Sequence, residues 1–143
     1  MIMKKKKKKT LIFTTAFVLL FSCLLSGCGI GTSETTKLRD LEFTIVSEER
    51  LPEELKSLIE ERKATEFKVT YSDKEYLYIC IGYGEQETGG YSIAVNDLYL
   101  ADNAIYISTS LLGPGPEDKT SDAPSYPYIV VKTEYLDKSV VFE

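Results

Sequence analysis

The chain has 143 residues, of which 17 are basic, 22 are acidic and none is histidine. The absence of histidine excludes Ser-His-Asp triads and histidine-ligated metal sites, so a hydrolase would need another arrangement of Ser, Lys, Asp or Glu. The acidic balance opposes binding to nucleic acid, because the phosphate backbone would be repelled.

The first 27 residues have the order of a secretory signal peptide. Six lysines at 4–9 are followed by an apolar stretch from residue 11 to 25 and then by small residues before Cys28. The apolar stretch has fifteen residues, which is fewer than the roughly 20 that a membrane-spanning helix needs. We therefore expect residues 1–27 to be removed during export.

The residues that end this segment, Leu25-Ser26-Gly27-Cys28, resemble the bacterial lipobox. The resemblance implies that the Cys28 thiol receives a diacylglyceryl group and that acyl chains such as palmitate anchor the protein. Two acyl chains anchor stably, because each buried methylene contributes about 0.8 kcal/mol. We expect a lipoprotein on the extracytoplasmic face of the cell membrane; the alternative is an ordinary signal peptide that a cysteine happens to follow.

Loss of the signal peptide would change the charge of the protein. Without the six lysines, 11 basic and 22 acidic residues remain, a net charge of −11. Such a surface is repelled by anionic lipid headgroups. The lipid, rather than a basic patch, is therefore expected to hold the protein at the membrane.

After the signal peptide, composition predicts a lipidated tether at 28–40 and one domain at 41–143. The tether is rich in Gly, Ser, Thr and charged residues, which is typical of a flexible spacer. The rest is long enough for one hydrophobic core. It contains one further thiol, Cys80, whose apolar neighbours Ile79 and Ile81 predict a buried residue rather than a reactive one.

The domain is predicted to begin with a strand at 41–46, where apolar and polar residues alternate, and to continue with a helix at 52–63. Pro52 suits the first position of that helix, and acidic residues follow it. The apolar residues at helical spacing are Leu51, Leu55, Leu58 and Ile59.

Six further strands are predicted from alternating or continuous apolar runs separated by turn residues. They span residues 66–71, 76–83, 91–100, 104–112, 128–135 and 139–142. Because most connections are short, we expect antiparallel pairing. The predicted fold is α+β and mostly antiparallel β, either a curled sheet or a small two-layer sandwich of six to seven strands, with one N-terminal helix.

The most specific motif is Thr88-Gly89-Gly90-Tyr91, which leads directly into a predicted strand. Adjacent glycines permit a positive φ or a close approach of two backbones. A tight connection between strands is the favoured reason for them, and direct contact with a ligand is the alternative. The acidic residues of the neighbouring loops are interpreted as solvated charges, so no metal and no cofactor is expected.

Residues 82–142 resemble the C-terminal domain of the protease complex subunit PrcB family. The resemblance is carried by Gly82, by the Thr88–Tyr91 motif, by the loop prolines Pro114 and Pro116, and by Pro127 before an aliphatic strand. It implies a lipoprotein that supports the assembly or stability of an extracellular protease complex without catalysis.

Two function hypotheses follow, with an enzyme of unusual type as a third. The first is a non-catalytic interaction module for an exported protease or another surface protein. Its candidate surface is Thr88, Gly89, Gly90, Tyr91, Tyr126 and Pro127. The second is a lipoprotein that binds a small ligand or a cell-wall glycan, which predicts a concave groove lined by tyrosines and acidic residues.

Overall fold

The computed structural model describes residues 34–143. The predicted signal peptide, the lipidation site Cys28 and the part of the predicted tether up to residue 33 lie outside the described residues. The elements, in chain order, are β1 (Lys37–Asp40), β2 (Phe43–Ile45), the short 3-10 helix η2 (Glu48–Arg50), α2 (Glu53–Arg62), β3 (Glu66–Ser72), β4 (Tyr76–Tyr83), β5 (Ser92–Ala101), β6 (Ile105–Leu112), β7 (Tyr128–Glu134) and β8 (Val140–Phe142).

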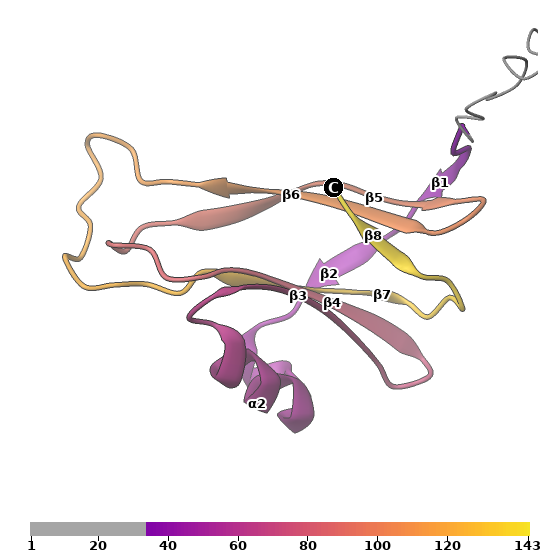
Figure 1. The fold of residues 1–143 in the computed structure, drawn as a ribbon, viewed down its shortest axis with the longest axis horizontal. Helices are drawn as coiled ribbons and strands as arrows, with labels where there is room; N and C mark the ends of the chain where they lie inside the picture. The colour runs from indigo at the N-terminus through magenta and orange to yellow at the C-terminus, as the bar shows by residue number, and fades with distance from the viewer. Residues whose placement is uncertain (1–33) are drawn as a thin grey trace, which may run out of the picture. The chain divides into compact units, whose positions relative to one another are not determined.

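The strands form two four-stranded sheets that face each other as a sandwich, and α2 covers the outer face of one of them (Figure 1). One sheet has the order β1-β5-β6-β8, and the other has the order β2-β7-β4-β3. The prediction of a mostly antiparallel sandwich with a covering helix is confirmed, although the described residues contain eight strands rather than six or seven.

Strand β4 lies between two apolar layers. Ile79 and Ile81 point into the core between the sheets, whereas Tyr78 and Cys80 pack with α2. All four side chains are buried. This double coverage explains why the sequence of β4 is continuously apolar and does not alternate.

The helix is attached through Leu55 and Ile59, which are 1% and 2% exposed and pack with the outer face of the β2-β7-β4-β3 sheet. It begins after Pro52 and carries Glu53 and Glu54 in its first turn. These acidic residues face the positive end of the helix dipole. The predicted helix at 52–63 is therefore confirmed to within one residue at each end.

Two predictions near the ends of the domain are wrong. Lys37–Asp40, placed in the tether, form β1 and pair with β5, so the folded domain begins before residue 41. The expected antiparallel pairing does not hold for the last strand: β8 lies in the other sheet from β7 and pairs in parallel with β6. Both elements are short, so their pairing depends on a free neighbouring strand and not on their own pattern.

Candidate interaction surface

The Thr88–Tyr91 motif lies against the loop that joins β6 to β7, at one end of the sandwich (Figure 1). The backbone N–H of Gly89 donates to the carbonyl of Ser121 at 3.1 Å, and the hydroxyl of Ser125 donates to the carbonyl of Thr88 at 2.6 Å. Gln86 and Ser125 exchange two backbone hydrogen bonds beside them. The motif therefore joins two loops that are far apart in the sequence.

The second glycine of the motif is required by its backbone and its neighbours. Gly90 has a φ of +87°, and a Cβ there would lie 3.0 Å from the side chain of Thr120 and 3.1 Å from that of Pro114. A Cβ on Gly89 would meet its nearest neighbour, Ser121, at an ordinary 3.5 Å. A tight connection between strands, the favoured interpretation, therefore explains why a glycine stands at position 90.

We expect Gly90→Ala to destabilise the domain by about 2 kcal/mol, because a positive φ and a crowded Cβ are both unfavourable for alanine. The matched substitution Gly89→Ala should change the free energy of unfolding by less than about 0.5 kcal/mol. Urea unfolding of the two variants measures both effects. Equal losses at the two positions would contradict the assignment of the constraint to Gly90.

The structure brings Tyr126 and Pro127 to the same end of the sandwich. The hydroxyl of Tyr126 donates to the carboxylate of Glu85 at 2.9 Å, and this hydrogen bond raises the pKa of Tyr126. The ammonium group of Lys63, after α2, lies 5.7 Å from the centre of the Tyr126 ring. The carbonyl of Pro127 accepts a hydrogen bond from the N–H of Tyr83 at 3.0 Å. Thr88, Gly89, Gly90, Tyr91, Tyr126 and Pro127 thus form one region, and its role in binding a partner stays a prediction.

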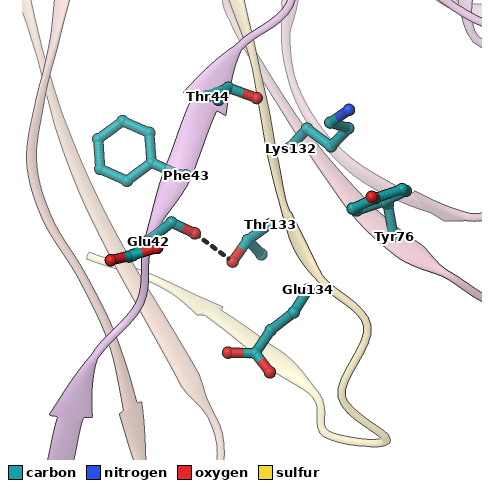
Figure 2. Close-up of a pocket in the computed structure, with 7 residues that line it drawn as sticks. All are labelled: Glu42, Phe43, Thr44, Tyr76, Lys132, Thr133 and Glu134. Atoms are coloured by element: carbon teal, nitrogen blue, oxygen red, sulfur yellow. Dashed lines mark hydrogen bonds between the residues drawn. The ribbon is translucent and has the colours of Figure 1, made fainter.

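A second feature, not predicted from the sequence, is a pocket of about 410 Å³ beside β2 (Figure 2). Its floor crosses three neighbouring strands, β2, β7 and β4. It is lined by Glu42, Phe43, Thr44, Tyr76, Lys132, Thr133 and Glu134. The only signal in the sequence was the alternation at 41–46, which indicates a strand but not that its apolar residues are exposed.

The contacts around this pocket are mostly polar. The Thr133 hydroxyl donates to the Glu42 carbonyl at 2.8 Å, and Arg39 forms an ion pair with Glu134 at 2.7 Å. The Lys132 ammonium lies 4.4 Å from the centre of the Tyr76 ring. The groove predicted for a glycan should be lined by several tyrosines, whereas this pocket has one, Tyr76, whose ring is already in contact with a cation.

Neither an accessible thiol nor a cluster of metal ligands occurs in the described part of the chain. Cys80 is fully buried as predicted, and burial raises the pKa of its thiol to about 12, so the reactive thiolate is disfavoured at neutral pH. Within residues 34–143, no cluster of three His, Cys, Asp or Glu side chains is placed to hold a metal ion. The helices of this region are also too short or too polar to cross a membrane.

The part of the chain that is similar to a known family consists of four consecutive strands, β4 to β7. Residues 77–134 match the family model described as PrcB C-terminal, which covers β4, β5, β6 and β7. No curated protein and no solved structure matches the chain. The match begins earlier and ends earlier than the resemblance at 82–142, because it includes β4 from its second residue onward and stops before β8. The central strands of both sheets, within residues 77–134, are therefore similar to the PrcB C-terminal family.

Proposed function

We propose that this protein is a membrane-anchored, extracytoplasmic accessory protein that binds an exported protease and supports its assembly or stability without catalysis. The observation that carries the proposal is the match of residues 77–134 to the PrcB C-terminal family. The PrcB-like domain suggests an accessory role in a protease complex. The sandwich offers the edges and loops through which β domains commonly contact partners.

Anchoring through Cys28 is the first part of the proposal, and it is supported by the lipobox sequence and by the net charge of −11 after removal of residues 1–27. We expect Cys28→Ser to lower the membrane-bound fraction of the protein about tenfold or more, because both acyl chains are lost. Cell fractionation and immunoblotting measure this. Cys23→Ser is the matched control, because Cys23 would be discarded with the signal peptide, and an equal fractionation of both variants would contradict the anchor.

Binding to an exported protease is tested on intact cells. The full chain is cross-linked with a membrane-impermeant reagent, isolated through an affinity tag, and its partners are identified by mass spectrometry. The control carries the same residues 1–34 fused to an unrelated acidic domain. An exported protease recovered with the full chain and not with the control is the expected result. Recovery of the same proteins with both would contradict the proposed function.

The absence of catalysis is tested on the purified full chain with a panel of peptidase, esterase and glycosidase substrates. We expect no turnover above the buffer. Turnover of any of these substrates that persists through further purification would contradict the non-catalytic role.

A further inference from the structure

Strand β2 is an open edge of its sheet. It pairs with β7 on one side, and the order β2-β7-β4-β3 places it at the end of the sheet. The N–H of Val46 donates to the carbonyl of Val130 at 2.9 Å, and the carbonyl of Glu42 accepts from Thr133, so the even-numbered residues turn their backbone groups toward β7. Because these directions alternate along a strand, Phe43 and Ile45 turn theirs to the open side.

The side chains on this edge are apolar and exposed. Phe43 is 39% exposed and Ile45 is 58% exposed. They stand opposite Thr133 and Val131, both of which are buried, so they continue the core face of the sheet past its last strand. Figure 2 shows the ring of Phe43 pointing away from β7.

The opposite edge of the same sheet is built differently. The exposed residues of β3 are all polar: Glu66, Lys68, Thr70 and Ser72. Charged and polar side chains are the usual protection of an edge against pairing with another chain. Strand β2 has no such protection at Phe43 and Ile45, because both side chains are apolar and exposed. It also lies outside the family match at 77–134, as an addition beside β7.

Carboxylates flank β2 at both ends, whereas two basic groups beside it already have partners: Lys132, opposite Thr44, contacts Tyr76, and Arg39 pairs with Glu134. Glu42 precedes β2, and Glu48 and Glu49 follow it in η2. Among the described residues, the ion pairs include neither Glu42 nor the two acidic residues of η2. Figure 2 shows the carboxylate of Glu42 directed to the same open side as Phe43. The unpaired carboxylates favour a positively charged occupant.

We propose that β2 binds an extended, basic segment of a partner protein, which adds to the sheet as a new strand beside Phe43–Ile45. The segment has the pattern aliphatic, Lys or Arg, aliphatic. Its aliphatic side chains cover Phe43 and Ile45, and its basic side chain lies on the other face, beside Thr44 and within reach of Glu42, which has no ion-pair partner among the described residues. This inference rests on the proposed function and deepens it by naming the contact surface and the chemistry of the partner segment.

A second copy of the chain fits this edge less well. Antiparallel pairing of two β2 strands would place Phe43 opposite Ile45, which is favourable. However, it would also bring together two domains that each carry a net charge of −11 and would place the acidic residues around both strands side by side. A basic segment has no such repulsion.

The test uses the full chain in detergent and a fluorescein-labelled ten-residue peptide of alternating lysine and valine. A peptide of the same composition with all valines adjacent is the control. Fluorescence anisotropy should give an affinity for the alternating peptide about tenfold higher than for the control. Equal affinity for the two peptides, or no saturable binding, would overturn the proposal.

Variants locate the contact. Ile45→Pro removes an N–H that the fold does not use, and Ile45→Lys and Glu42→Lys place a repelling charge at the edge. Each should weaken binding about tenfold, whereas Leu112→Lys and Glu66→Lys, which make matched changes elsewhere on the surface, should change it less than about twofold. An unchanged affinity in all three edge variants would overturn the proposal.

Two further measurements separate this inference from the proposed function. In the cross-linking experiment, Ile45→Lys should lose the exported protease; if it recovers as much as the unaltered chain, the accessory role stands and the β2 edge is not its surface. In analytical ultracentrifugation the unaltered chain should be monomeric; a dimer that Ile45→Lys dissociates would assign the edge to a second copy and overturn the proposal.

Discussion

Replacing Gly82 with alanine should lower the free energy of unfolding by about 3 kcal/mol, which is a large loss for a single methyl group. Gly82 lies in β4 directly opposite Phe67 of β3. The ring of Phe67 folds over the glycine, and three of its atoms lie within 2.8 Å of the place where a Cβ would be. The ring is buried at 7% exposure, so it cannot move aside without disturbing the layer under α2.

A double-mutant cycle with Phe67→Leu tests the cause. Phe67→Leu removes the ring from above Gly82, so Gly82→Ala in that background should cost less than about 1 kcal/mol. Urea unfolding followed by circular dichroism gives the four free energies. If Gly82→Ala costs the same with and without the ring, then contact with Phe67 is not the reason for a glycine in the middle of this strand.

Shortening Leu55 should have a comparable effect through the opposite mechanism, a cavity. Leu55 is 1% exposed and packs between α2 and its sheet. We expect Leu55→Ala to destabilise the domain by about 3 kcal/mol, because the methylenes lose their burial and the space they leave is not refilled.

Leu58→Ala is the matched control for this prediction. It makes the same change of helix propensity on the same helix, but Leu58 is only partly buried. Its cost should be about 1 kcal/mol, and the difference between the two variants reports the packing of the helix on the sheet. Equal costs, measured by the same urea unfolding, would show that α2 is not a firmly packed layer.

Much of the fold was predictable because it depends on short-range rules. The β3–β4 hairpin follows from two apolar runs around a polar turn, in which the side chain of Asp73 accepts hydrogen bonds from the N–H groups of Glu75 and Tyr76 at 3.2 and 2.8 Å. The β5–β6 hairpin follows from the same kind of pattern. Pro52 and the spacing of Leu55 and Ile59 indicated the helix.

The candidate site was predictable in part. The Thr88–Tyr91 motif indicated a constrained turn, and the structure explains it by the positive φ of Gly90 and its contact with Pro114 and Thr120. The exposed edge at Phe43 and Ile45 was not predictable, because alternation cannot distinguish a strand covered by a neighbouring sheet from one that lies at an edge.

The elements that were predictable from the amino-acid pattern are those stabilised by nearby residues: the hairpins, the helix and the turn motif. The sequence also predicts the signal peptide and the lipobox at Cys28, because such linear signals need no fold to be recognised. Three features depend instead on contacts between distant segments: the pairing of β1 with β5, the parallel pairing of β8 with β6, and the exposure of β2. The reason is physical: a strand receives half of its hydrogen bonds and its burial from segments distant in sequence, so its place in a sheet depends on which edge the rest of the chain leaves free.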